Sequence, residues 1–222
     1  MLHSPLAALR ATRDHIYSTR HVLGEDDSRH DVWPVGLTRE RGEALRDLAL
    51  AERAASIVET GFAYGMSASF LLEAALTTSP ASAQLVSMDP FQSIHWKGAG
   101  VRHLRDAGLT KFHELLEAPS DAALPRLIAD GRRFDLAFID GDHRFESVFL
   151  DIHFARKLVG PGKLIIIDDA WMPSVQKAAA FFAGANLCRR EETPAASPLA
   201  KFILLRVDAA GEARDWDHFA PF

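Results

Sequence analysis

The sequence of 222 residues has a single cysteine, Cys188, so no disulfide can form within the chain. Such cysteine usage is typical of a reducing compartment such as the cytoplasm, and no Cys-His signature around Cys188 indicates a catalytic thiol. No apolar run approaches the roughly 20 residues that a membrane span needs. The N-terminus shows neither the apolar core nor the cleavage pattern of a signal peptide. We therefore expect a cytoplasmic protein that makes no use of a membrane.

Basic residues are also scarce, since 25 Lys and Arg stand against 30 Asp and Glu and the formal net charge is −5. Binding to a phosphate backbone favours a basic face, and no run of Lys and Arg creates one locally. We therefore expect no nucleic-acid partner. Hydrophobic residues make up 48% of the chain, which is enough to bury a sheet between two layers of helices.

The sequence has no internal repeat and divides into an N-terminal helical extension, residues 1–52, and an α/β domain, residues 53–222. We do not expect the extension to fold independently. We expect it to contain a first helix at 6–17, a polar loop at 24–34, and a second helix that Thr38 caps and that runs to about residue 51. Two roles for the extension stay open: a cover over the active site, or the contact surface of a homodimer.

The predicted domain alternates short apolar strands with helices. We expect strands at 56–61, 85–89, 112–116, 134–140 and 163–168, and helices at 64–76, 101–107, 120–130, 146–158 and 174–182. A late strand at 201–207 has 187–190 as its antiparallel partner. This order predicts a doubly wound, mainly parallel, Rossmann-like sheet with an antiparallel C-terminal strand. Ligands of such sheets bind beyond the carboxyl ends of the strands.

The first strand ends in an acid and two glycines, Glu59, Gly61 and Gly65. Gly61 permits a tight turn, and Gly65 permits close approach to a ligand. The middle glycine of the dinucleotide pattern G-x-G-x-x-G is missing, which counts against a nicotinamide cofactor. The second strand ends in Asp89, whose carboxylate suits the hydroxyls of a ribose and equally suits the cap of a turn before Pro90.

Acidic residues also follow the fourth and fifth strands. Asp140 ends one strand, and Asp168 and Asp169 end the next. Three carboxylates that converge at one sheet edge repel one another unless a cation or protons compensate, and oxygen ligands favour Mg²⁺, Mn²⁺ or Ca²⁺. His143 follows three residues after Asp140 and suits a general base. The alternatives are acids that cap the following turns and a histidine that only packs at the cleft edge.

The segment from Ile57 to Ser67 resembles the first motif, E/D-x-G-x-x-x-G, of class I S-adenosylmethionine (SAM) methyltransferases. In that family the glycine turn packs against SAM, the acid holds its amino-acid part, and residues after the third strand contact adenine. The resemblance implies a SAM site formed by Glu59, Gly61, Tyr64, Gly65, Ser67, Asp89, Glu117 and Asp140.

The segment Ile139-Asp140-Gly141-Asp142-His143 with the later Asp168-Asp169 pair resembles cation-dependent O-methyltransferases. The similarity is closer to the branch of macrolide-sugar O-methyltransferases and cephalosporin-hydroxylase-like proteins, and it covers about residues 36–185. It implies Asp140, Asp168 and Asp169 as ligands of Mg²⁺ or another divalent cation, and His143 as the base. The catechol and caffeoyl-CoA branch has Asp-Asn at the last pair, so its substrates are not carried over.

Together these features predict Mg²⁺-dependent, SAM-dependent O-methylation of a small hydroxylated molecule. Three alternatives remain: a nicotinamide-dependent oxidoreductase, a SAM- or metal-binding module without transfer activity, and metal-dependent chemistry other than methyl transfer. The aromatic residues Phe91, Trp96 and Trp171 fall in loops at the predicted ligand face, either as a pocket for the acceptor or as packing for the loops.

Overall fold

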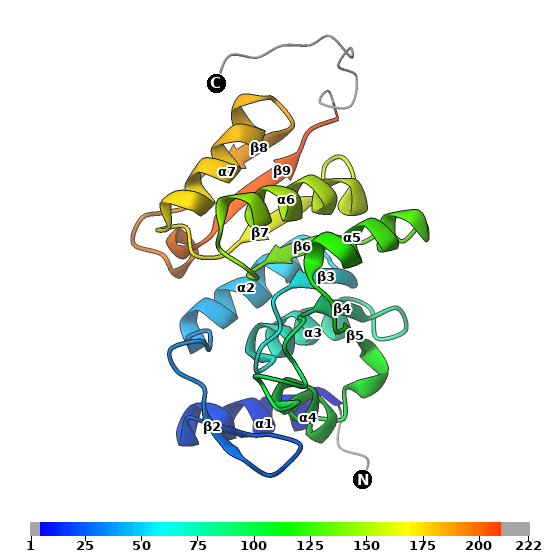
Figure 1. Cartoon of the computed structure of the whole chain (residues 1–222), viewed down its shortest axis with the longest axis vertical. Helices are drawn as coiled ribbons and strands as arrows, with labels where there is room; N and C mark the ends of the chain where they lie inside the picture. Colours follow the sequence, from blue (N-terminus) through cyan, green and yellow to red (C-terminus); the bar gives the residue numbers. More distant parts are fainter. Residues whose placement is uncertain (1–4, 210–222) are drawn as a thin grey trace.

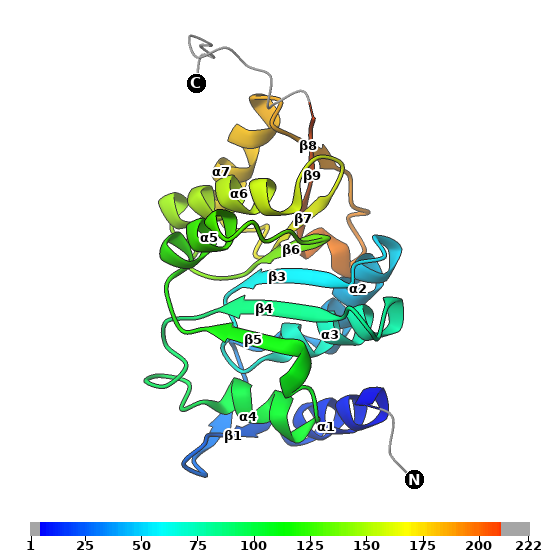
Figure 2. The same ribbon diagram turned by 90° about the vertical axis from the view of Figure 1, so that its right-hand side faces the viewer.

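The computed structural model describes residues 5–209, so residues 1–4 of the predicted extension and residues 210–222 of the predicted α/β domain lie outside the described residues. Its main sheet has seven strands, and Figure 2 shows them side by side. Their order across the sheet is β5 (His113–Leu116), β4 (Gln84–Met88), β3 (Ser56–Thr60), β6 (Leu136–Ile139), β7 (Leu164–Ile167), β9 (Ile203–Val207) and β8 (Cys188–Glu191).

The first five strands of this order run parallel, and β9 is antiparallel to both of its neighbours. The predicted doubly wound sheet with an antiparallel C-terminal strand is therefore confirmed. The β8–β9 pair also confirms the expected antiparallel partner of the last strand.

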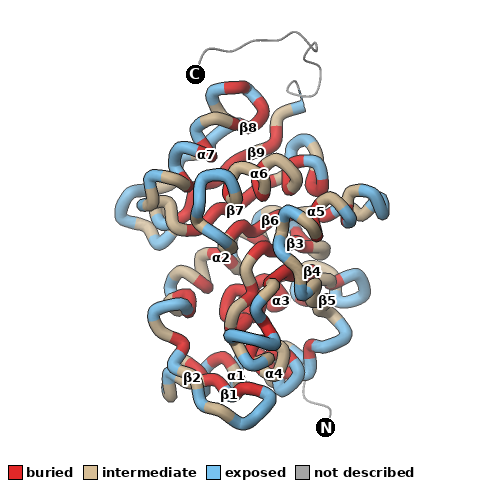
Figure 3. Tube along the Cα trace, viewed as in Figure 1, coloured by how far each residue is buried: buried red, intermediate tan, exposed pale blue. Residues whose placement is uncertain are grey.

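Helices cover both faces of this sheet because successive strand residues point to opposite faces. On β3, Ile57 joins one core and its neighbour Val58 joins the other. The first core faces α3 (Met66–Thr78) and α4 (Ala99–Asp106); the second faces α5 (Ser120–Ala129), α6 (Phe145–Val159) and α7 (Pro173–Gly184). Figure 3 shows the buried strands between these layers. Among the described helices, none is long and apolar enough to span a membrane.

The N-terminal region packs on the same side as α3. It contains α1 (Pro5–Thr19) and α2 (Arg39–Ala51), and the Thr38 side chain caps α2 by accepting a hydrogen bond from the backbone N–H of Arg41. Buried side chains from both helices, including Leu9 and Leu45, belong to the core beneath α3. The region is thus part of one packed body, with α1 at the end opposite α7 (Figure 1).

The expectation of a loop at 24–34 was wrong in part, because this stretch belongs to a hairpin of β1 (His21–Leu23) and β2 (Arg29–Asp31). Its turn closes through the N–H of Gly24, which donates to the Ser28 carbonyl at 2.8 Å. The Asp26 carboxylate also accepts the N–H of Ser28 at 3.1 Å. Polar turn chemistry of this kind suits a tight connection between strands as well as a loop.

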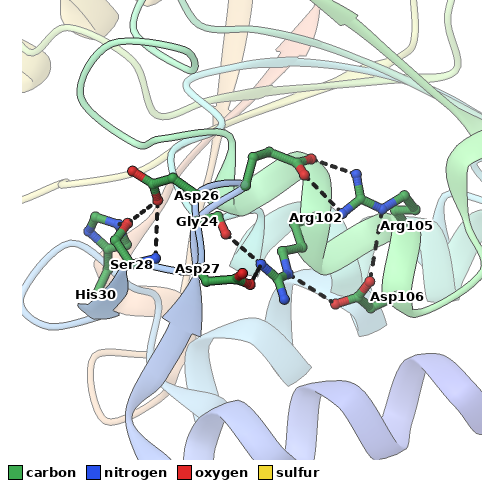
Figure 4. Close-up of polar contacts among 9 residues, drawn as sticks. Gly24, Asp26, Asp27, Ser28, His30, Arg102, Arg105 and Asp106 are labelled. Carbon is green, nitrogen blue, oxygen red and sulfur yellow. Dashed lines mark hydrogen bonds and ion pairs between the residues drawn. The ribbon is translucent and has the colours of Figure 1, made fainter.

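Charged side chains fix this hairpin against α4 (Figure 4). Arg102 donates to the Gly24 carbonyl and to the Asp27 carboxylate, each at 2.6 Å. Arg105 pairs with Glu25 at 2.6 Å. The N–H of Glu25 in turn donates to the Lys97 carbonyl at 2.7 Å, so the hairpin also supports the long loop between β4 and α4.

The order of the strands reverses between β3 and β6, and the two strand ends meet there very closely. Gly61 follows β3 with φ of 83°, and a Cβ atom on it would lie 2.0 Å from the carbonyl oxygen of Asp140. The backbone N–H of Asp140 donates to the Thr60 carbonyl at 2.9 Å. Only glycine permits both this backbone conformation and this approach.

Replacing Gly61 with alanine should therefore destabilise the fold more than the same change at Gly108. Gly108 also has a positive φ, 74°, but open space surrounds the position of its Cβ. We expect a loss in unfolding free energy of about 2–5 kcal/mol for G61A, from strain plus the clash, and about 1–2 kcal/mol for G108A, from strain alone. Urea unfolding measures both, and equal losses would contradict the proposed clash.

Candidate active site

A cavity of about 840 Å³ opens at the carboxyl ends of the strands, at the point where the strand order reverses. Its walls come from the turn after β3, the loop after β4, the ends of β6 and β7, and residues 34–37 ahead of α2. Eight of the residues predicted from the sequence line it: Gly61, Tyr64, Ser67, Asp89, Asp140, His143, Asp168 and Asp169. The site therefore lies where a doubly wound sheet binds its ligand.

Glu59 lies behind this wall and is completely buried. Its carboxyl group accepts hydrogen bonds from the hydroxyls of Ser67 at 2.5 Å and Ser87 at 2.6 Å. Burial raises the pKa of Glu59 to about 8, although the two serine hydroxyls oppose the shift. This acid organises the turn from within, and its partner Ser67 lines the cavity.

Gly65 and Glu117 also lie outside the cavity lining. Gly65 precedes α3 with φ of 70°, and a Cβ on it would meet the Phe62 ring at 3.1 Å and the Gly100 carbonyl at 3.3 Å. The close approach at Gly65 is thus to protein atoms. The Glu117 carboxylate accepts the N–H of Ser93 at 2.7 Å and lines a smaller neighbouring pocket. Their contacts with a cofactor stay predictions.

Asp89 holds the loops on both sides of it. One carboxylate oxygen accepts the N–H of Ala63 at 2.7 Å, in the turn after β3, and the other accepts the N–H of Phe91 at 2.8 Å. The turn-capping alternative is therefore present in the structure. Because Asp89 also lines the cavity, its predicted contact with a ribose remains compatible with this geometry.

Three predicted residues meet at the ends of β6 and β7. The His143 Nε2 atom lies 2.7 Å from a carboxylate oxygen of Asp169 and 3.6 Å from one of Asp140. One ligand atom from each of these residues falls within 4.8 Å of the other two. This spacing is suitable for a divalent cation, and the sheet edge brings the residues together because β6 and β7 are parallel neighbours.

The charges in this cluster depend on one another. The nearby carboxylates of Asp140 and Asp169 raise the pKa of His143 to about 10, and the contact with His143 lowers the pKa of Asp169. Burial raises the pKa of Asp140, with His143 opposing that shift. A pKa of about 10 corresponds to an imidazolium at neutral pH, and an imidazolium cannot accept a proton.

Asp168 pairs with a residue outside this cluster. Its side chain is 4% exposed and contacts the guanidinium of Arg41, from α2. Burial raises the pKa of Asp168 to about 7, and the Asp140 carboxylate adds to the shift while Arg41 opposes it. Its Oδ1 atom also accepts the N–H of Asp169 at 2.6 Å. The predicted three-carboxylate set thus converges on one edge, but one member already has a counter-ion.

A cover over the active site was one of the two roles left open for the N-terminal region, but the contact of Arg41 with Asp168 was not predicted. Residues 34–37 and Arg41 line the cavity, and Arg41 is separated from Asp168 by 127 positions in the chain. Thr38 was the one available signal, because a cap at that position places Arg41 in the first turn of the helix.

The sequence of residues 58–170 matches a family described as a methyltransferase domain. This segment covers half of the chain and contains the turn after β3, Asp140, His143 and the Asp168-Asp169 pair. The chain therefore belongs to this methyltransferase-domain family, and with its sheet topology it is a class I SAM-dependent methyltransferase. No curated protein matches the sequence.

Several solved structures share the fold. The O-methyltransferase TomG of Streptomyces achromogenes, involved in tomaymycin synthesis and in complex with SAM, has a TM-score of 0.70 at 20% identity, over 91% of this chain and 90% of that one. An O-methyltransferase from Bacillus cereus, in complex with SAH, has a TM-score of 0.69 at 17% identity, over 91% of both chains. A SAH-bound methyltransferase of Podospora anserina has a TM-score of 0.68 at 16% identity, over 90% and 88%.

The pKa of His143 predicts a pH-dependent contribution to stability in protein kept free of divalent ions. Because the folded pKa, about 10, lies above the usual 6.5, the stabilisation is fully present below about pH 6.5 and is lost as the pH rises through about 10. The unfolding free energy of the wild type should exceed that of H143Q at pH 6.5, and this difference should shrink toward pH 10. Chemical unfolding in EDTA measures it, and a constant difference across this range would contradict the charge assignment.

Proposed function

We propose that this protein is an O-methyltransferase that transfers the methyl group of SAM to a small hydroxylated acceptor, with help from a divalent cation. The observation that carries the proposal is the cluster of Asp140, His143 and Asp169 in the cavity at the strand ends. It unites a proton-accepting group and two cation-binding carboxylates beside the turn that the methyltransferase family uses for its cofactor.

The cavity fits SAM in size and charge. Its volume, about 840 Å³, lies within the range of about 300–1,000 Å³ for small-molecule sites. Acidic side chains outnumber basic ones in its lining, which favours a ligand with a sulfonium charge. Trp96 lines the same cavity, and its buried indole Nε1 has no hydrogen-bond partner among the described residues. Such a donor is available to a polar group of the cofactor.

One part of the cavity wall, at Val35 and Phe91, suits an acceptor with apolar surface. Val35 is 51% exposed and Phe91 is 47% exposed, and both line the cavity. Exposed apolar side chains that surround polar groups are typical of a small-molecule site. The acceptor would lie between this wall and His143, and the sulfonium end of SAM would lie beside the turn at Gly61.

The residues present also fit a divalent cation, since Asp140 and Asp169 offer carboxylate oxygens in a partly buried position. When bound there, the cation would supply positive charge that lowers the pKa of an acceptor hydroxyl and replaces the charge of the protonated His143. Asp140 and Asp169 would hold it, and the Asp168 carboxylate stays with Arg41.

The chain's own groups then have distinct tasks. Neutral His143 takes the proton of the acceptor hydroxyl at Nε2, the atom that faces the two carboxylates. The turn at Gly61, with Ser67 and Asp89, orients the cofactor, and the loop segments at 34–37 and 91–96 exclude water from the reacting groups. The transfer is an in-line displacement, in which an oxygen–carbon bond forms as the sulfur–carbon bond breaks.

Replacing His143 with alanine should lower kcat by about 100- to 10,000-fold, because the acceptor loses its base. The dissociation constant of SAM, measured by calorimetry, should change by less than about two-fold, because the imidazole acts on the acceptor and not on SAM. Methyl transfer from labelled SAM to a panel of hydroxylated molecules, with product mass, gives the rate. H15A, at an exposed histidine of α1, is the matched control. An unchanged kcat in H143A would exclude the base role.

Removal of divalent ions should abolish transfer and leave SAM binding in place. We expect micromolar SAM binding by calorimetry with Mg²⁺ and with EDTA, and transfer only with Mg²⁺. Asp169→Asn should mimic EDTA, because it removes a carboxylate of the cluster that is not among the predicted SAM contacts. Transfer at the same rate in EDTA would rule out the cation, and absence of SAM binding in both conditions would overturn the proposal as a whole.

A further inference from the structure

Arg41 stands out among the cavity-lining residues because it adds a permanent positive charge to the cation site. It comes from α2, ahead of the methyltransferase segment in the chain, and its guanidinium contacts the buried carboxylate of Asp168. Guanidinium remains protonated at all accessible pH values. The strand-end acids therefore have a counter-ion of their own before any metal ion binds.

The contact fixes Asp168 more firmly than an exposed ion pair would. The Asp168 side chain is 4% exposed and that of Arg41 is 22% exposed, so water screens the pair weakly. The same Asp168 oxygen that contacts Arg41 accepts the N–H of Asp169. The ring of Phe202 lies on another side of Arg41, 5.6 Å from its Cζ atom. Asp168 is thus held at one oxygen by two donors.

The other two acids have no such partner. Among the described residues, the ion pairs of Asp140 and Asp169 are with His143. These two carboxylates and the imidazole form the group whose ligand atoms lie within 4.8 Å of one another, and Asp168 is not part of it. The Asp169 carboxylate also accepts the indole N–H of Trp171 at 3.0 Å. The three acids therefore separate into one with a permanently charged partner and two whose partners carry no permanent charge.

We propose that Arg41 is a positioning residue that reserves Asp168 as its own counter-ion and so limits the cation site to Asp140, Asp169 and the neighbouring His143. This inference rests on the proposed function, because it concerns the cation that assists methyl transfer. A site with two carboxylates binds a divalent ion less tightly than one with three. A site with fewer protein ligands would leave room for the acceptor oxygen, and Arg41 would thereby set the affinity for the cation.

The test measures Mn²⁺ affinity of the whole protein without SAM or acceptor, by electron paramagnetic resonance of free Mn²⁺ and by calorimetry. Arg41→Ala frees the third carboxylate and should tighten binding by about ten-fold. The double variant R41A/D168N removes both members of the pair and should return to the wild-type affinity within about two-fold. Arg41→Gln should behave as R41A does. It keeps more of the side-chain volume, so it serves as a second variant if R41A fails to fold.

Arg39→Ala is the matched control, because Arg39 lies on the same helix and pairs with Asp14 at the surface. Its Mn²⁺ affinity should equal that of the wild type. If R41A and R41Q, both folded by circular dichroism, bind Mn²⁺ no more tightly than the wild type, the inference is wrong while the proposed cation stands. A double variant far weaker than the wild type would show that Asp168 is already a ligand and would also overturn it.

Two further outcomes bear on the proposed divalent cation as well as on Arg41. If the wild type binds no Mn²⁺ but R41A does, Arg41 reserves Asp168 as proposed, and the cation is excluded from the function of the natural protein. If no variant binds Mn²⁺, both the inference and the cation fail.

Discussion

Carboxylates at the ends of parallel strands are the constraint on which the rest of this site depends. A doubly wound sheet brings the ends of its central strands to one edge, and here β6 and β7 place Asp140, Asp168 and Asp169 there. Their negative charges must be compensated for the chain to fold around them. The structure compensates them with Arg41 on one side and His143 on the other.

This compensation links stability to function. A His143 that is protonated by its carboxylate neighbours stabilises the ion-free fold, yet only the neutral imidazole can act as a base. The same contacts therefore favour opposite protonation states of His143 before and during the proposed reaction. The proposed metal ion would resolve the conflict by pairing with the carboxylates of Asp140 and Asp169. Arg41 contacts Asp168 instead. This balance of charge supports the proposed metal ion.

The sequence was sufficient to predict the sheet, because each central strand is a short apolar run that ends in an acid or a glycine. Asp140 and Asp169 could be brought together from their positions after neighbouring strands. The hairpin of β1 and β2 was not predicted, since its strands have three residues each and depend on Arg102 and Arg105 of a distant helix. The burial of Glu59 was also not predicted, because a motif gives residue types and not the direction in which a side chain points.

The sequence pattern divides the chain near residue 52, but the cavity is lined by residues from both sides of this position. Residues 34–37 form part of the cavity wall, and the Tyr17 hydroxyl of α1 donates to the Leu37 carbonyl at 2.8 Å, which ties that wall to the first helix. Arg41 enters the cluster of acids from the same region. A protein cut at residue 52 would keep the turn after β3 and all three acids. It would lose the guanidinium of Arg41, which balances the charge of Asp168. The N-terminal region thus supplies part of the cavity wall and a counter-ion for one of its acids.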